Sequence, residues 1–495
     1  MIKITDLFFY LSKRSSNKIF VIWAFFIFIY PTVLVAQIIN LNENKISLLN
    51  KGDAFWHRSN QLGIVDGDGY VSISIFRHSS AFFNYGIMGI GNFEKDNSYK
   101  MVVGYLEKDI RGLNIILGRW RKDITSESEL STGSLIRGKN AIPIPQVSLR
   151  LSDFKKITFF NQDLWVKGGF SHGWFSKGGY VQAPFLHEKY VYFKKYFENQ
   201  SSLTFGLVHE AMWGGETNKH GKQPQSFSDY LRVVFGRPGS GSAYEGEKIN
   251  VLGNHLGIWD LSYDIQGESQ NYRIYFQHPF EDKSGMYQHF FDELKKRKIP
   301  VKSFDGLLGF EIINQSNEWF TSFVYEYMNT MYQSGSESAA KSDSTYGQDD
   351  YFNHYIYTSG WTQNDYSLGN PLFIVGHYPG IRTENSYIIN NRIRAHHFGL
   401  SGKVTPSISY KSLLTYSKNY GTYFDTDKFK SLKNPYPFEG GLKQLSGLIQ
   451  LDFNPIWKNV NGQISYAFDR GDLYSDSDSF LFSISYQFSN LSTSH

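Results

Sequence analysis

The chain has 495 residues and no cysteine, which excludes a disulfide framework, a cysteine-ligated zinc site, a thiol nucleophile and a lipoprotein anchor. Its formal net charge is +4, most of it within residues 1–36, so nothing in the composition indicates a nucleic-acid partner. Aromatic residues make up 17% of the chain, although its mean hydropathy is only −0.37. This combination is typical of membrane strands, in which only every second residue faces lipid.

The first predicted element is an N-terminal targeting segment. Basic residues cluster over 13–18 and precede an apolar run over 19–36, which ends on Ala36 and is followed by polar residues. This order is that of a secretory signal peptide, so we expect cleavage after Ala36. The alternative is a retained transmembrane anchor, because about 18 apolar residues is the lower limit for a span, but Pro31 and the Leu-Val-Ala ending favour cleavage. No other apolar run is as long, so a mature protein in a membrane would cross it as strands.

Most of the remaining chain alternates between apolar and polar residues with a period of two, which indicates β-strands with one apolar face. The pattern is clearest over 480–488, where Phe480, Phe482 and Ile484 alternate with polar or smaller residues. In chain order the predicted strands lie near residues 70–76, 101–106, 113–118, 147–152, 164–170, 190–196, 203–210, 230–236, 256–264, 272–277, 307–313, 319–327, 385–389, 395–404, 408–417, 445–453, 460–469 and 480–488.

Turns and loops separate these strands. The Asp-Gly-Asp-Gly sequence at 66–69 has the composition of a tight turn, and residues 281–298 could form a short amphipathic helix that ends in a basic cluster. The predicted long polar loops cover residues 214–226, 236–254, 279–305, 331–355 and 418–444.

A soluble β-sandwich would also alternate, but its apolar face would consist mainly of Val, Ile and Leu. Here that face is rich in Tyr, Phe and Trp, as expected of lipid-facing strands with aromatic girdles. We therefore expect residues 37–495 to form one domain in an outer membrane. This domain is predicted to be all-β, a transmembrane antiparallel β-barrel of about 18 strands with long polar loops and at most short helices. Its last strand is expected at about 480–488.

Sequence motifs for catalysis or metal binding are weak. His209-Glu210 resembles the start of a zinc-protease helix, but Trp213 stands where the second histidine would be required. Glu281 and Asp282 could in principle act as a glycosidase pair, but adjacent residues in a strand point apart. We therefore expect no metal, no cofactor and no catalytic residues.

Several charged residues fall opposite the apolar positions of their strands and are predicted to point into the barrel. The expected role is to form ion pairs and hydrogen bonds that fill the interior, and the alternative is to line a polar conduit or a sugar-binding surface. The residues are Glu210, Arg232, Asp260, Arg273, Glu326 and Asp452.

Collinear stretches over most of the mature chain resemble the Wzi-like capsule assembly family of outer-membrane proteins. They are residues 130–134, 140–145, 209–215 (HEAMWGG), 227–237 (FSDYLRVVFGR), 250–260 (NVLGNHLGIWD), 275–285 (YFQHPFEDKSG), 305–309, 325–335, 360–361, 369–371, 396–402 and 421–423. The resemblance implies an 18-stranded barrel that attaches or organises capsular polysaccharide and acts like a lectin. One departure is that Phe488 is followed by a short tail, whereas outer-membrane barrels often end on an aromatic residue.

Sugar binding suggests a role for polar and aromatic residues in these stretches, because sugars offer apolar ring faces to aromatics and hydroxyls to polar groups. For each residue the alternative is loop packing or turn geometry. The candidates for stacking are Trp213, Tyr287 and Trp361. The candidates for hydrogen bonding are Glu216, His220, Asn254, Gln277, His278, Glu281, Asp282 and Asn370, and Arg232 and Lys283 could bind an acidic capsule.

The sequence thus predicts an outer-membrane barrel, not an enzyme, that binds capsular or extracellular polysaccharide. Its other expected partners are outer-membrane lipid and the barrel-insertion machinery. Two rival hypotheses remain: a porin or solute channel, and an outer-membrane enzyme acting on lipid or glycan.

Overall fold

The computed structural model describes the chain in segments. These are residues 43–50, 53–64, 69–77, 83–92, 99–120, 128–176, 181–282, 285–286, 305–315, 318–333, 349–376, 388–423, 436–457 and 459–488. The expected signal peptide lies outside them, as do most of the expected helix at 281–298 and of the turn at 66–69. Within the described part, no helix is long and apolar enough to cross a membrane.

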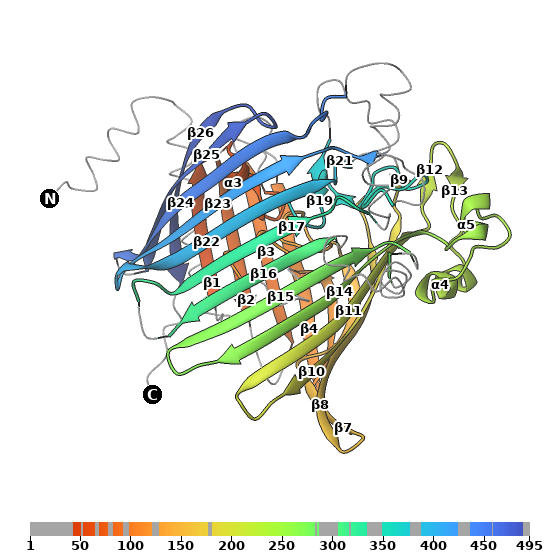
Figure 1. Ribbon diagram of the computed structural model, residues 1–495, viewed down its shortest axis with the longest axis horizontal. Helices are drawn as coiled ribbons and strands as arrows, with labels where there is room; N and C mark the ends of the chain where they lie inside the picture. The colour runs from red at the N-terminus through yellow and green to blue at the C-terminus, as the bar shows by residue number, and fades with distance from the viewer. Residues whose placement is uncertain are drawn as a thin grey trace.

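One antiparallel sheet dominates the described residues and contains 19 strands (Figure 1). In chain order they are β1 (Glu43–Asn50), β2 (Gly69–Arg77), β3 (Asn84–Asn92), β4 (Tyr99–Ile110), β5 (Leu113–Arg119), β6 (Gln146–Leu151), β7 (Lys155–Phe159), β8 (Gln162–Trp174), β10 (Phe185–Tyr196), β11 (Ser201–Trp213), β14 (Asn254–Gln266), β15 (Gln270–Phe280), β16 (Gly306–Asn314), β17 (Ser322–Asn329), β22 (Ile393–Thr405), β23 (Ile408–Asn419), β24 (Leu442–Trp457), β25 (Val460–Gly471) and β26 (Ser477–Phe488).

The sheet closes on itself. Each strand pairs with the next around the wall, and β1 pairs with β2 on one side and with β26 on the other. Strands β6 and β7 both pair with β8, at successive positions along it, and so share one place in the ring. The described strands therefore fill eighteen places, which confirms the predicted barrel.

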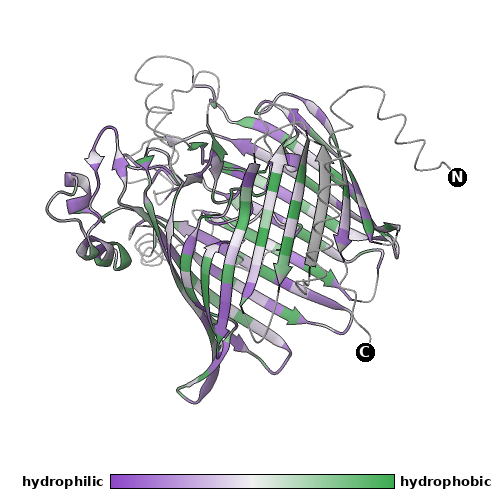
Figure 2. Ribbon diagram, turned by 180° about the vertical axis from the view of Figure 1, so that it is seen from behind, coloured by the Kyte–Doolittle hydropathy of each residue, from purple (hydrophilic) through white to green (hydrophobic). Residues whose placement is uncertain are grey.

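Side chains alternate across the wall, as Figure 2 shows by the alternating colours along the strands. In β11 the side chains of Leu203 and Phe205 point outward and are exposed, whereas Val208 and Glu210 point inward and are buried. Exposed outward-facing apolar residues recur around the ring, for example Leu261, Phe398 and Phe482. Such a surface is costly in water, but it matches the lipid-facing band of a membrane barrel.

The remaining elements lie in the connections. They are α3 (Phe55–Arg58), β9 (Val181–Gln182), β12 (Glu216–Thr217), β13 (Gly221–Lys222), α4 (Phe227–Val234), α5 (Glu245–Ile249), β18 (Thr362–Gln363), β19 (Tyr366–Ser367), β20 (Ile374–Val375) and β21 (Ile388–Asn390). At one end of the barrel, the turn end, connections are as short as Arg111-Gly112, where both residues have the positive φ of a tight hairpin turn. At the other end, the loop end, β11–β14, β15–β16, β17–β22 and β23–β24 are joined by long segments.

One of the predicted strands is wrong, another lies outside the barrel sheet, and three strands of that sheet were not predicted. Residues 230–236 fall in α4 and just after it, because Ser226 caps this helix by a reciprocal hydrogen-bond pair with Asp229. Of the predicted strand at 385–389, the structure describes residues 388 and 389, which lie in the short strand β21, outside the barrel sheet. The missed strands are β1, β7 and the glycine-rich β3, in which Gly86 leaves space for the rings of Phe76 and Tyr105.

Three chain segments fill the lumen, and we refer to them together as the plug. They are residues 53–64, 128–145 and 349–376, and many of their apolar side chains belong to the main buried core. The first segment contains α3, whose His57 ring nitrogens lie 3.0 and 2.9 Å from the hydroxyls of Ser479 and Ser465 on the barrel wall.

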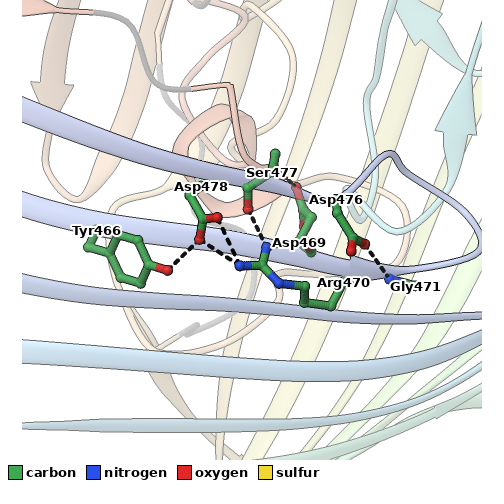
Figure 3. A network of polar contacts seen from close by, with 7 residues as sticks. All are labelled: Tyr466, Asp469, Arg470, Gly471, Asp476, Ser477 and Asp478. Carbon is green, nitrogen blue, oxygen red and sulfur yellow. Dashed lines mark hydrogen bonds and ion pairs between the residues drawn. The ribbon is translucent and has the colours of Figure 1, made fainter.

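The loop-end hairpin between β25 and β26 also holds this first plug segment. The backbone N–H of Phe55 donates to the Asp469 carboxylate over 2.9 Å. Figure 3 shows how Arg470 stabilises the same hairpin by donating to the carbonyl oxygens of Asp469 and Ser477 and to the Asp478 carboxylate. Asp469 thus points inward and binds the plug, whereas Arg470 stabilises the turn between β25 and β26.

The second plug segment binds inward-facing residues predicted from the sequence. Glu326 accepts hydrogen bonds from Thr132 N and Oγ1 at 2.8 and 2.7 Å. Arg137 donates to both Glu210 carboxylate oxygens at 2.8 and 2.6 Å, and both side chains are buried. These inward charges therefore hold chain segments in place and do not line an open conduit.

The predictions for the other inward-facing charged residues are confirmed in three cases and wrong in one. Asp260 accepts from the Tyr192 hydroxyl, Arg273 pairs with Asp264, and Asp452 accepts from glutamine amides, as expected of interior polar contacts. The prediction for Arg232 is wrong, because this residue lies in α4 and donates to Pro238 O at 2.9 Å.

The buried Arg137–Glu210 contact leads to a stability prediction. Replacement of Arg137 by Ala leaves a buried carboxylate uncompensated, so we expect the free energy of unfolding to fall by about 3–5 kcal/mol. Denaturant unfolding of the full chain in detergent measures this loss. The matched control is Lys139→Ala, because Lys139 pairs with the exposed Glu129 and the expected loss is under about 1 kcal/mol. Equal losses in the two variants would contradict the proposed anchoring role of Arg137.

Candidate functional site

A cavity of about 400 Å³ lies at the loop end, and we refer to it as the acidic cavity. Its walls come from the start of β14, the residues after β15, the segment between α4 and β14, and the segment 349–355. The lining side chains with polar groups are Asn250, Asn254, His255, Glu281, Asp282, Asp349, His354 and Tyr355. This combination of carboxyl, amide and aromatic groups is able to bind a polar ligand in several orientations.

Strand pairing positions two walls of the acidic cavity. Because β14 and β15 pair with Gly257 opposite Phe280, Asn254 and Glu281 come to the same end of the barrel. Gly253, at φ +95°, turns the chain into β14, and its N–H donates to the Glu247 carboxylate at 2.9 Å.

A hydrogen bond joins the third wall, which is the segment 349–355, to the residues after β15. Glu281 Oε1 accepts from Phe352 N at 2.7 Å and so fixes the segment that carries His354 and Tyr355. Residues separated widely in the sequence therefore form one cavity.

Burial favours the uncharged forms of Glu281 and His354 at this cavity. It raises the pKa of Glu281 well above its usual range, with a further contribution from the neighbouring Asp349, while the hydrogen bond from Phe352 opposes the shift. Burial lowers the pKa of His354 to about 3. In its protonated form, which burial favours, Glu281 donates as well as accepts hydrogen bonds.

Asn254 has a buried side-chain donor at the cavity. The residue is only 3% exposed, and its Nδ2 has no hydrogen-bond partner among the described residues. A buried amide without a partner costs free energy, and a ligand oxygen would recover it.

A second loop-end cavity, of about 490 Å³, lies beside the plug. Its polar lining includes Arg58, Asp365, Tyr366 and Tyr474. None of the residues proposed from the sequence as sugar contacts lines this cavity. Among the described residues, no group of three His, Asp or Glu could hold a metal ion.

The structure brings together three of the predicted binding residues, Asn254, Glu281 and Asp282. Four others are built into the fold. Trp213 is buried below α4, Trp361 is fully buried and donates to Ile136 O, and Gln277 and Asn370 bind the plug segment 128–145. Neither indole offers a face for stacking.

The remaining predicted residues are dispersed. Glu216 is exposed on β12, and the His220 ring lies 5.0 Å from that of Tyr244. His278 binds Asp305 O at 2.7 Å, and Arg232 lies in α4. Lys283 and Tyr287 lie outside the described residues.

Asp349, His354 and Tyr355 were not among the residues predicted from the sequence to bind sugar. They lie at the end of a stretch that was interpreted as a surface loop, and no local pattern distinguishes them from other loop residues. Contacts across the fold, such as that between Glu281 and Phe352 N over 71 positions of the chain, bring them to the cavity.

The fold and the cavities define a class, namely an outer-membrane β-barrel whose lumen is filled by its own chain and whose polar cavities lie at the loop end. The family model of the capsule assembly protein Wzi matches residues 58–373, which is more than half of the chain. The protein therefore belongs to the Wzi capsule assembly family.

The fold is also that of a solved structure. The chain is similar to Wzi from Escherichia coli, described as a carbohydrate-binding β-barrel of the outer membrane involved in group 1 capsule assembly, with a TM-score of 0.59 and 12% identity over 92% of this chain and 86% of that one. It also matches the outer-membrane protein OprD of Pseudomonas aeruginosa with a TM-score of 0.42 and 9% identity over 90% of this chain and 93% of that one. No curated relative matches the chain.

Burial of Glu281 predicts a pH dependence of stability. Because its pKa is raised on folding, this group contributes stability that is present below its unfolded value of 4.5 and is lost as the pH rises through the folded value. Glu281→Gln keeps an uncharged acceptor for Phe352 N. Between the unfolded and the folded pKa of Glu281, the free energy of unfolding of the variant should therefore rise relative to that of the wild type. We expect this rise to be at most about 1.4 kcal/mol per pH unit.

Unfolding midpoints measured between pH 4 and pH 10 test this prediction. Asp282→Asn is the control, because this neighbouring carboxylate is exposed. If the unfolding midpoints of Glu281→Gln and the wild type differ by the same amount across this pH range, burial does not shift the pKa of Glu281.

Proposed function

We propose that this protein binds capsular or extracellular polysaccharide at the cell surface and thereby attaches or organises it there. The observation that carries the proposal is the combination of a filled lumen with polar cavities at the loop end. Membership of the Wzi capsule assembly family and the similarity to a carbohydrate-binding barrel of Escherichia coli support it. The exported chain is proposed to lose its signal peptide near Ala36 and to fold as a single domain, with help from the barrel-insertion machinery.

The orientation follows from the lengths of the connections. Outer-membrane barrels have short periplasmic turns and longer extracellular loops. The loop end, with both cavities, then faces the outside of the cell, where polysaccharide is held. Residues of the plug that reach this end, such as Tyr355, become accessible to an extracellular glycan.

The acidic cavity provides suitable chemistry for a sugar. The Tyr355 ring is 45% exposed and can pack against the apolar face of a pyranose. Asn254 Nδ2 and the Glu281 carboxyl can bind ring hydroxyls. Because these interactions position a ligand and activate no nucleophile, we propose binding and not catalysis.

Loss of the Tyr355 ring tests this site. We expect Tyr355→Ala to weaken binding of the organism's own polysaccharide about tenfold, which corresponds to about 1.4 kcal/mol. Titration calorimetry with the full-length protein measures the affinity. Phe160→Ala is the control, because this exposed aromatic residue lies in a turn at the opposite end. Equal affinities of the wild type and Tyr355→Ala would exclude this ring from the site.

A deletion strain tests the cellular role. Without the protein, polysaccharide synthesis should continue while less of the polymer stays with the cells and more appears in the medium. Quantification of both fractions checks this. Unchanged cell-associated polysaccharide would exclude the proposed function.

Conductance separates this proposal from the porin hypothesis. The plug is held to the wall by buried contacts such as Glu326 with Thr132, so we expect no steady channel in planar bilayers. A large, stable conductance of the wild-type protein would favour a solute channel instead.

A further inference from the structure

Helix α4 packs against the outside of the barrel wall. In β11 the inward-facing Glu210 places its neighbours Ala211 and Trp213 on the outer face. These two residues form a buried cluster with Val233 of α4, and the Trp213 ring stacks on that of Tyr230 with centroids 5.3 Å apart. Figure 1 accordingly shows α4 and α5 beside the barrel, near the ends of β11 and β14.

The helix borders the lipid-facing surface directly. Its Tyr230 ring lies 5.7 Å from the outward-facing His187, whose ring lies 4.9 Å from that of Phe170. Phe170 is 41% exposed on the outer face of β8. One continuous line of contacts therefore runs from α4 to the exposed apolar surface of the wall.

A second side of α4, adjacent to the side that packs on the wall, is apolar and uncovered. Phe227, Leu231 and Phe235 follow at intervals of four residues, so they lie on one side of the helix and its C-terminal end. They are 75%, 41% and 66% exposed. A surface helix normally turns such a row toward a core, but here the core-facing side is already formed by Tyr230, Val233 and Val234. Figure 2 shows α4 largely in the colour of hydrophobic residues.

Positive charge lies at the end of this apolar row. The Arg237 side chain is exposed, and its guanidinium carbon lies 5.7 Å from the centre of the Phe235 ring. A helix with an apolar face and adjacent arginines suits a membrane surface, because the apolar residues enter the acyl region while the cations reach anionic headgroups.

We propose that α4 is an interfacial helix whose Phe227, Leu231 and Phe235 side chains insert into the lipid leaflet at the loop end. Arg237 then meets the anionic headgroups of that leaflet. Because this face is continuous with the lipid-facing wall, we infer that it contacts lipid and not a protein or a glycan. This inference does not depend on the proposed polysaccharide binding.

Fluorescence quenching in vesicles tests the proposal. Because the chain has no cysteine, Leu231→Cys can be labelled uniquely with nitrobenzoxadiazole in the full-length protein. The labelled protein is reconstituted in phosphatidylcholine–phosphatidylglycerol vesicles with and without doxyl-labelled lipid. Leu261→Cys, on the lipid-facing wall, is the positive control, and Ser475→Cys, beside the plug, is the aqueous control.

We expect doxyl quenching at position 231 to lie within about twofold of that at 261, and iodide quenching to be at least about threefold weaker than at 475. Quenching like that of Ser475→Cys would overturn the proposal. Protection of position 231 from iodide by polysaccharide, but not by lipid, would assign the face to glycan and also overturn it. Heat-modifiable electrophoretic mobility checks that each variant is folded.

A charge variant tests the role assigned to Arg237. Arg237→Gln should reduce doxyl quenching at position 231 in vesicles with phosphatidylglycerol and leave it unchanged in pure phosphatidylcholine. Equal quenching with and without Arg237 in both vesicles would remove the headgroup contact from the proposal.

Discussion

A membrane offers no hydrogen-bond partner to an unpaired backbone group, so a chain that crosses it as strands must close its sheet. In this protein the closure depends on β1, which pairs with β2 and with the last strand, β26. A ring of eighteen strands is wide enough to leave an aqueous channel. The plug is a consequence of that width, because wall side chains alone do not fill so large a lumen. Its polar contacts with Glu210, Glu326 and Asp469 then explain the inward-facing charges.

The fold was largely predictable because the two faces of a membrane strand differ so strongly. Alternation revealed strands such as β25 and β26, where apolar residues repeat at every second position. It failed at α4, where the apolar residues around Leu231 suit a strand as well as a helix and the capping pair of Ser226 and Asp229 decides between them. It also failed at β3, because glycine carries no side chain to mark a face.

The site was less predictable, because its residues depend on contacts across the fold. Asn254, Glu281 and Asp282 stood out in the sequence as polar residues within the stretches that resemble the family, and they do meet at one cavity. Trp361 and Asn370 stood out equally, but they serve to hold the plug. No local pattern separates a residue that binds a ligand from one that binds another part of the same chain. The partner segment has to be known first.

The plug also constrains the order in which the chain assembles. The segment 128–145 precedes its partners Glu210, Gln277 and Glu326 in the sequence, so it is present before the wall that encloses it is complete. The ring can close only when β26, the last strand along the described chain, reaches β1. Until then β1 and β25 each keep an open edge, and such edges attract other strands. Closure of the barrel and enclosure of its contents are therefore one event, completed from the C-terminal end.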